Sequence, residues 1–335
     1  MRAFEVNVDG AALAARGAIM LPANVQYVWA HPSRRTLYVV SSNGGPGVGR
    51  DKHLATALAI DPATGALQPH GDAASLPSRP IHVSVDASGQ YLLTAYNNPS
   101  GLTVHRLNAA GTIGAPVAQA ADLDTGIYAH QILATPSNRC VTLVTRGNNA
   151  TATKPQDPGA IKTFAFNGRI LRNSASIAPG SGLGFGPRHL DFHQNKPWAF
   201  VSIERQNKLY VYALDEATGL KGEPMFVKNT LSDPKSPPSQ GAGPIHIHPD
   251  GRFVYVTNRT FPAVGDGRRA FSPVAKIISS CSRSIRTAAS RKRSSISRVA
   301  AFSCALSASI QAAAFWSSRV SCRCRFATAR VCRRE

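Results

Sequence analysis

Two positions of a repeated strand–turn–strand unit carry side chains that could bind an anion and transfer a proton. His130 and Arg188 stand at the start of the first strand of two units, and Arg146, Glu204 and Arg259 stand at the end of the second strand of three. One charged residue at a strand end is ordinarily only a solvated side chain. Arginines, a carboxylate and a histidine repeated in register are less easily explained in that way. These five residues therefore form one candidate site.

Such a set could bind an anionic substrate and activate water against it. Guanidinium groups bind phosphate or carboxylate through paired hydrogen bonds, a role that Arg188 and Arg259 can fill with Arg146 beside them. A general base must activate water near neutral pH, and either His130 or Glu204 can do this. One of the arginines can donate to the tetrahedral oxyanion. No His/Asp/Glu cluster has metal-ligand spacing, so neither a metal nor another cofactor is expected.

The repeat that positions these residues has a period near fifty. The segment 186–214 shows its form most clearly, with three strands separated by polar turns in GPRHLDFHQNKPWAFVSIERQNKLYVYAL. The residues before the turn of each unit are spaced by 55, 49, 58 and 55, at His31, Asp86, Thr135, His193 and His248. Further strands and turns lie between the units. About four short strands per repeat of this length is typical of a β-propeller blade. The predicted fold class is all-β, an incomplete propeller of about five blades.

In a blade the first and second strands are antiparallel neighbours, so the start of one and the end of the other share an edge of the sheet. Because the first strand lines the central channel, the five candidate residues should surround one mouth of it. His82, His189 and His246 lie one to three residues further along the first strand. They are predicted to pack in the channel rather than to catalyse, with His189 and His246 within reach of a substrate.

The net charge of +20 is unevenly distributed along the chain. Residues 271–335 contain 13 Lys and Arg and one acidic residue, which is +12 and leaves +8 for the first 270. This segment also has five of the six cysteines and no glycine. Because the basic excess lies in the tail, the charge does not predict a nucleic-acid-binding fold, and we expect no nucleic-acid partner.

Targeting signals and membrane spans are not found in the sequence. No apolar run reaches 18 residues, and the opening MRAFEVNVDG has neither a basic n-region nor an apolar h-region. We therefore expect a cytoplasmic protein without a membrane partner. The sequence does not define its oligomeric state.

The motifs GPRHLDFHQN, VSIERQNKLYVYAL and HPDGRFVYVTNRT resemble the seven-bladed propeller lactonase family, which includes bacterial 6-phosphogluconolactonases and fungal carboxymuconate cyclases. The resemblance spans roughly 1–260. It implies an active-site histidine, two arginines and a glutamate at His130, Arg188, Arg259 and Glu204. It also implies a lactone hydrolase of the 6-phosphogluconolactonase type acting in the pentose phosphate pathway. The loop RGNNATATKPQDPG is longer than the resemblance leads us to expect.

Two other functions are compatible with these motifs. The same arginines could serve a carboxymuconate-type cyclase that forms a lactone from a dicarboxylate. A non-catalytic propeller that acts as a binding module is the other alternative, because PDGRFVYVTN also resembles repeats of that kind. The charged residues and the lack of a signal peptide favour an enzyme with a small anionic lactone as its substrate.

The chain divides into a propeller domain, 1–270, and a basic Ser/Ala/Arg/Cys-rich tail, 271–335, that is predicted to be out of frame. With suitably chosen codons, the segment 273–286 read from the last base of the first codon gives GGENNIVVFSIDP. The same shift in 299–319 permits GRGIQLRTFGIDPGGRILVVA, a strand–turn–strand sequence. On this hypothesis the tail is disordered or partly helical, and the chain as written folds poorly and has little activity. The alternative is a natural basic tail.

Overall fold

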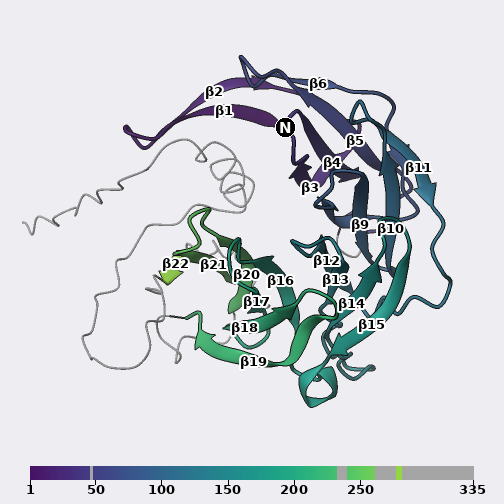
Figure 1. The fold of residues 1–335 in the computed structure, drawn as a ribbon, viewed down its shortest axis with the longest axis vertical. Helices are drawn as coiled ribbons and strands as arrows, with labels where there is room; N and C mark the ends of the chain where they lie inside the picture. Colours follow the sequence, from purple (N-terminus) through teal and green to yellow (C-terminus); the bar gives the residue numbers. More distant parts are fainter. Residues whose placement is uncertain (46–47, 232–239, 261–276, 281–335) are drawn as a thin grey trace, which may run out of the picture.

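The structure is a computed structural model that describes residues 1–45, 48–231, 240–260 and 277–280, and almost all of its regular elements are β-strands (Figure 1). Four antiparallel sheets and part of a fifth follow one another around a centre. The strands of the first blade are β3 (Asn24–Ala30), β4 (Thr36–Ser42), β5 (His53–Ile60) and β6 (Leu67–Pro69), with β7 (Ala74–Ser75) also paired to β5. Those of the second blade are β8 (Pro80–Val85), β9 (Tyr91–Asn97), β10 (Ser100–Leu107) and β11 (Ile113–Val117).

The next blades repeat the same meander. The third blade contains β12 (Ala129–Ala134), β13 (Cys140–Thr145), β14 (Ala160–Phe166) and β15 (Leu171–Ile177). The fourth contains β16 (Pro187–Phe192), β17 (Trp198–Ile203), β18 (Lys208–Asp215) and β19 (Gly219–Asn229), and the short 3-10 helix η1 (Pro179–Gly182) precedes it. The fifth contains β20 (Gln240–Ile247), β21 (Val254–Thr260) and β22 (Ile277–Ser280). A separate hairpin is formed by β1 (Arg2–Asn7) and β2 (Ala12–Ala18). The prediction of an all-β propeller with about five blades is confirmed.

The strands of a blade differ in how deeply they are buried. The second strands β9 and β13 are buried at every residue, as their near-continuous apolar sequences YLLTAYN and CVTLVT require. By contrast, the outermost strand β15 is buried only at its two ends, and its sequence LRNSASI is largely polar. The second and third blades therefore have fully buried second strands, and the third has a solvated strand at its outer edge.

The apolar core lies between the blades rather than inside one of them. Four buried clusters each join a pair of consecutive blades, from the first and second to the fourth and fifth. The cluster between the third and fourth blades is centred on Val144, Leu190, Val201 and Tyr212. Among the residues that the structure describes, no such cluster joins the fifth blade to the first. The described blades therefore form an open arc (Figure 1).

Polar side chains connect the inner strands of neighbouring blades. Gln131 of β12 accepts a hydrogen bond from Leu190 N at 2.6 Å and donates to Leu190 O at 3.1 Å. Ser84 donates to Ile132 O at 2.8 Å, and Asp191 accepts from Ile247 N at 2.9 Å. These bonds pair backbone groups that the innermost strands leave unpaired.

The structure describes four residues of the tail, 277–280. Residues 271–276 and 281–335, where disorder or a helix is expected, lie outside the described residues. Ile277–Ser280 departs from that expectation, because it is β22 and pairs with β21 from Val254 to Thr257. Two adjacent β-branched isoleucines favour an extended segment there. In the described part of the chain, no helix is long and apolar enough to cross a membrane.

Candidate active site

The five candidate residues come from three consecutive blades and meet at one edge. His130 and Arg188 lie in β12 and β16, and Arg259 lies in β21. Arg146 and Glu204 each follow the last residue of a second strand, β13 and β17. Strand pairing places the start of β12 and β16 beside the end of β13 and β17, as the repeat predicts. The structure thus brings all five of these sequence-predicted residues together.

A β-bulge repeated in each blade aims two of these side chains. The register between β12 and β13 shifts between Ala129 and Gln131, and His130 is the unpaired residue. Arg188 is unpaired in the same way, between Pro187 and His189. A bulge turns a side chain out of the regular alternation of the strand. The sequence register gave no sign of this bulge.

Glu204 is the centre of the site. Its Oε1 accepts from Arg146 Nε at 3.2 Å, and its Oε2 accepts from Arg188 Nη1 at 3.2 Å and from Arg259 Nη2 at 2.8 Å. The carboxylate side chain is 7% exposed, against 13% for Arg188 and 29% for Arg259. Three guanidinium groups and one carboxylate leave a net charge of +2 on this cluster. Burial of like charges is costly, so the cluster favours an anionic ligand.

The backbone around Gly186 fixes the position of Glu204. Glu204 N donates to Gly186 O at 2.9 Å, and Gly186 has φ +53°, in the left-handed region. A Cβ at this position would lie 2.4 Å from Cγ of Arg205, whose side chain packs over the glycine. The first residue of the GPRH motif is therefore a glycine for conformational and steric reasons.

Arg188 and His130 are directly bonded. Arg188 Nη1 lies 2.8 Å from His130 Nε2, and because a guanidinium only donates, Nε2 must be the acceptor. The ring proton then sits on Nδ1, which is buried and has no hydrogen-bond partner among the described residues. Burial, together with Arg188 and Arg259, holds the pKa of His130 well below its usual value. Burial and the neighbouring Arg259 lower the pKa of Arg188 to about 10.

The channel histidines lie behind this cluster. The His189 ring is 4.9 Å from that of His130 and 5.9 Å from that of His82, in edge-on contacts. His246 is further along the channel, with Nδ1 3.9 Å from Asp191 Oδ2. Burial lowers the pKa of His246 to about 4 and raises that of Asp191 to about 7. His189 therefore stands next to the candidate site, whereas His246 faces Asp191 rather than the arginines.

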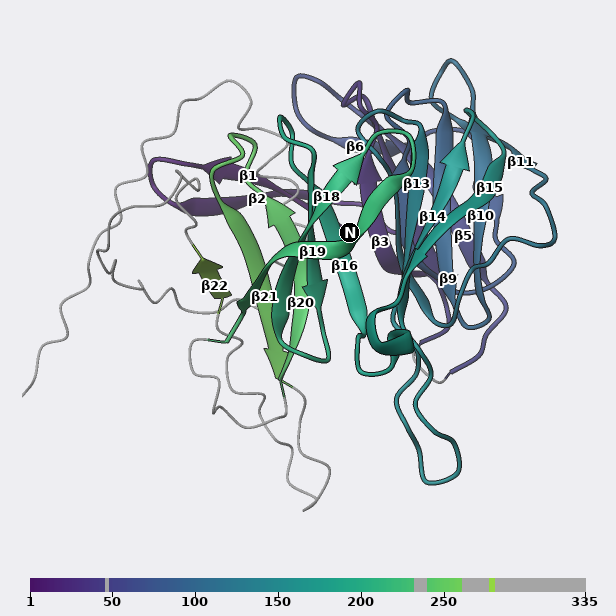
Figure 2. The same ribbon diagram turned by 60° about the horizontal axis from the view of Figure 1, so that its bottom comes forward.

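The sequence did not single out three other residues at this edge. Asn149 Oδ1 accepts from Arg146 Nη2 at 3.3 Å, and the Arg146 guanidinium lies over the Tyr128 ring at 5.1 Å. Arg205 donates to Gly147 O at 2.9 Å. Asn149 belongs to the long β13–β14 loop, which projects beyond the strand ends (Figure 2). The unusual length of that loop is the one feature of the sequence that could have drawn attention to this part of the site.

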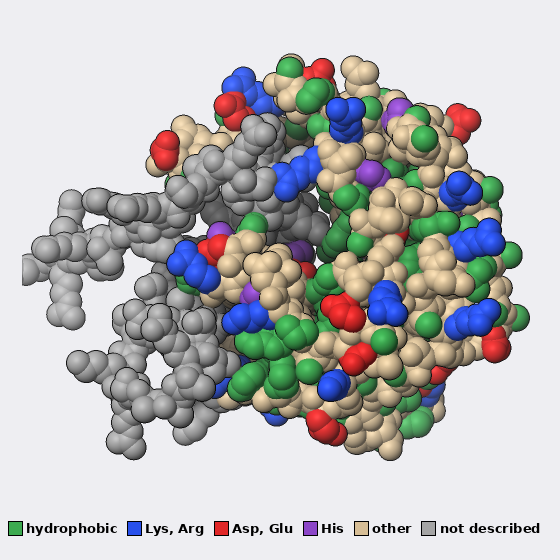
Figure 3. Space-filling view, viewed as in Figure 1, with side chains coloured by type: hydrophobic (Ala, Val, Ile, Leu, Met, Phe, Trp, Pro, Cys, Tyr) green, Lys and Arg blue, Asp and Glu red, His purple; other side chains and the backbone are tan. Residues whose placement is uncertain are grey.

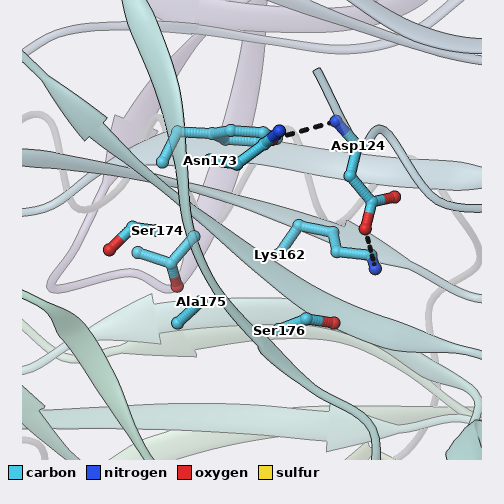
Figure 4. Close-up of a pocket in the computed structure, with 8 residues that line it drawn as sticks. Asp124, Lys162, Asn173, Ser174, Ala175 and Ser176 are labelled. Atoms are coloured by element: carbon cyan, nitrogen blue, oxygen red, sulfur yellow. Dashed lines mark hydrogen bonds and ion pairs between the residues drawn. The ribbon is translucent and has the colours of Figure 1, made fainter. Parts of the chain in front are cut away.

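A hollow of about 230 Å³ lies elsewhere, on β14 and β15 of the third blade (Figure 4). Lys162 pairs there with Asp124, whose backbone N–H donates to Asn173. These polar groups satisfy one another, and none of the five candidate residues lines the hollow.

Charge on the face seen in Figure 3 is mixed. Lys and Arg side chains are interspersed with Asp and Glu over the coloured part of the molecule, and they form no continuous basic track there. Across the described residues, no three His, Cys, Asp or Glu side chains are grouped to hold a metal ion.

Blades arranged around a centre, with a charged cluster at one edge of the inner strands, define a β-propeller with a candidate anion site. The match to a family model is consistent with this: residues 1–271 fit the description lactonase, 7-bladed beta-propeller. The chain therefore belongs to the seven-bladed β-propeller lactonase family, as its motifs predicted.

Curated relatives and solved structures agree with this assignment. The chain is 29% identical over 260 residues to the 6-phosphogluconolactonase of Bacillus subtilis, covering 76% of this chain and 70% of the relative. Identity to that of Pectobacterium carotovorum is 30% over 247 residues, 72% and 65% of the two chains. The periplasmic gluconolactonase of Pseudomonas aeruginosa has a similar fold, with a TM-score of 0.60 at 24% identity over 75% of this chain and 70% of that one. A putative 6-phosphogluconolactonase of Bacteroides uniformis gives 0.60 at 20% identity, over 89% and 76%.

Proposed function

We propose that the protein hydrolyses an anionic sugar lactone of the 6-phosphogluconolactone type. The observation that carries the proposal is the buried cluster of Arg146, Arg188 and Arg259 around Glu204, beside His130. An anionic substrate would compensate its net positive charge. The relatives named 6-phosphogluconolactonase support the same substrate class.

In the proposed reaction, a water oxygen attacks the lactone carbonyl carbon while a base removes a water proton. The ring C–O bond then breaks, and the released alkoxide takes up a proton. Arg188 and Arg259 would stabilise the intermediate oxyanion, because both guanidinium groups contact the carboxylate of Glu204, next to which the water attacks. No cofactor enters these steps.

Glu204 is the better base of the two candidates. The Nε2 lone pair of His130 already accepts from Arg188, and its other nitrogen carries the ring proton. A carboxylate has about four lone-pair positions, and Glu204 uses three of them for the arginines. One position is left to accept a proton from water. His130 then serves to orient Arg188.

The test is an assay of purified protein with 6-phosphogluconolactone, corrected for spontaneous opening. Glu204→Gln removes the base and should lower kcat/KM by roughly 100- to 10,000-fold. Glu216→Gln, at an exposed turn of the fourth blade, is the matched control and should have no effect. Lack of any enzyme-dependent opening by a sample that shows a cooperative melting transition would reject the proposal, and conversion of a carboxymuconate alone would favour the cyclase.

A further inference from the structure

We propose that Tyr128 positions Arg146 as the arm of the site that binds the anionic group remote from the lactone carbonyl. This inference rests on the proposed function and refines it. It separates the side of the cluster that reacts from the side that recognises the phosphate of the substrate.

Tyr128 is held against Arg146 by the backbone. Tyr128 O accepts from Arg146 N at 2.9 Å, and Ile127 O accepts from Gly147 N at 2.9 Å. With φ +60°, Tyr128 adopts a conformation that is unfavourable for an aromatic residue. Such strain persists where the surroundings enforce it, and often at ligand sites. In Tyr128 this conformation places the aromatic ring under the guanidinium of Arg146, the residue whose backbone N–H donates to Tyr128 O.

Three neighbours fix the Arg146 guanidinium. Its Nε donates to Glu204 Oε1 at 3.2 Å, its Nη2 donates to Asn149 Oδ1 at 3.3 Å, and its Cζ lies 5.1 Å from the centre of the Tyr128 ring. Within the described residues, Nη1 makes no hydrogen bond. The side chain is 15% exposed. Arg146 is thus rigidly oriented and still has donors for a ligand.

The two oxygens of Glu204 divide the arginines into two groups. Arg188 and Arg259 both contact Oε2, and Arg188 also contacts His130. Arg146 alone contacts Oε1. The reacting carbonyl oxygen belongs beside Arg188 and Arg259, which donate to the oxyanion, and the attacking water belongs at the free lone-pair position of Glu204, which is on Oε1. A second anionic group of the same substrate then extends towards Arg146 and Tyr128.

Arg79 adds positive charge on the same side. It donates from Nη2 to Gln26 Oε1 at 2.6 Å, and its Nε is buried without a hydrogen-bond partner in the described structure. Burial lowers the pKa of Arg79, and the nearby Tyr128 phenol partly opposes this shift. Because Arg79 directly precedes β8, it lies at the same edge of the inner strands as Tyr128 and Arg146, and two positive charges at this edge suit a dianionic phosphate better than a neutral hydroxyl.

The experiment is calorimetric titration of the full chain with two reaction products, 6-phosphogluconate and gluconate. Wild type should bind the phosphorylated acid more tightly. Tyr128→Leu removes the cation–π contact and should raise Kd for 6-phosphogluconate about tenfold, with the Kd for gluconate within about twofold of wild type. Tyr128→Phe keeps the ring and should bind both acids within about twofold of wild type.

A second variant separates positioning from a purely structural role. Asn tolerates positive φ better than Tyr, so Tyr128→Asn should melt no lower than wild type and yet bind 6-phosphogluconate as weakly as Tyr128→Leu. In lactonase assays, Tyr128→Leu should raise KM for the phosphorylated lactone and leave kcat within about threefold.

The inference is overturned if Tyr128→Leu weakens both acids equally or neither, if Tyr128→Phe behaves like Tyr128→Leu, or if wild type binds neither acid. Failure of the proposed function looks different. In that case wild type would bind 6-phosphogluconate selectively, and Tyr128→Leu would abolish the selectivity, but no lactone would be opened.

Discussion

In the proposed mechanism, Arg188 connects the base Glu204, His130 and the stabilisation of the oxyanion. One nitrogen of its side chain donates both to His130 and to Glu204. Burial and the charges of Arg188 and Arg259 keep His130 neutral, because a third positive charge there would be unfavourable. The charge state of the site at neutral pH is therefore fixed by its own arginines.

The pH dependence of ligand binding should report Arg188. Its pKa is lowered to about 10, so its charge is present at neutral pH and is lost as the pH rises through about 10. Affinity for 6-phosphogluconate should be flat from about pH 7 to 9 and fall above that, when measured by titration at fixed ionic strength. His130, already neutral, should contribute no change between pH 6 and 8. A step centred between pH 6 and 7 in the affinity for gluconate, which has no phosphate that titrates there, would contradict this account.

Asp191 should make stability depend on pH. Burial raises its pKa from 3.8 to about 7, so the folded state holds a proton that the unfolded state releases above pH 3.8. The contribution of Asp191 to stability is therefore expected to fall as pH rises from about 4 to 7, while His246, whose pKa burial lowers to about 4, contributes in the opposite direction. Asp191→Asn removes the falling contribution and should change the slope of melting temperature against pH to a more positive value in this range. An unchanged slope in the variant would show that Asp191 is not the cause, and His246 is the neighbour to test next.

At this scale the sequence predicted where the residues lie better than how they are oriented. The strand register located all five residues of the cluster from their spacing alone. It could not show the bulges at His130 and Arg188, because a bulge depends on the pairing of two strands. The positive φ of Tyr128 could not be predicted either, since tyrosine is not a residue type that favours this conformation.

At the scale of elements, the inner strands matter most, because they carry the site and connect the blades. Gln131 in β12 bonds both backbone groups of Leu190 in β16, the strand that carries Arg188. A change in this connection would alter both the stability of the third and fourth blades and the geometry of the cluster that spans them.

Gln131→Leu tests the connection. It would leave the buried N–H and C=O of Leu190 unpaired, at a cost of roughly 2–4 kcal/mol in the free energy of unfolding. Ser84→Ala removes a single bond, to Ile132 O, and should cost about 1 kcal/mol. Urea denaturation measures both values. If the two substitutions lower the free energy of unfolding by the same amount, the second hydrogen bond of Gln131 contributes nothing to stability.

The strand–turn–strand units were recognisable because apolar and β-branched residues cluster between polar turns at a regular spacing. The outer strands were less evident, since strands such as β15 are polar and mostly exposed. Among the described residues, the hairpin β1–β2 pairs with no other strand, and its Phe4 and Leu13 side chains are 49% and 56% exposed.

At the scale of the whole molecule, the described blades do not form a closed ring. Four apolar clusters hold five blades in an arc, and the family to which the chain belongs has seven. The edge of the last described blade is β22, which covers four residues only. An open arc exposes strand edges and apolar faces that a closed ring would cover.

We propose that a frameshift near 269–273, in the gene or from sequencing, replaced the remaining blades. Residues 271–335 lack glycine, whereas the chain as a whole has 27. In the shifted frame, the codons for 277–280 overlap the NNIV of GGENNIVVFSIDP, at the place where β22 pairs as a third strand. Both frames therefore put an extended segment there, but only the shifted one continues into a further strand and turn.

Sequencing the gene across the codons for 268–276 tests the proposal, and expression of both reading frames extends it. The shifted-frame chain should close the ring and cover the exposed face of Phe4 and Leu13, so it should melt at least about 5 °C higher than the chain as written, since each kcal/mol of added stability shifts the melting temperature by about 2–4 °C in a domain of this size. It should also stay monomeric at concentrations where the chain as written associates, as light scattering after gel filtration would measure. Residues 130–259 contain the whole arginine cluster, so both chains should bind 6-phosphogluconate when folded. If the confirmed DNA does not read as blade sequence in the shifted frame, the tail is a natural basic extension and the frameshift is ruled out.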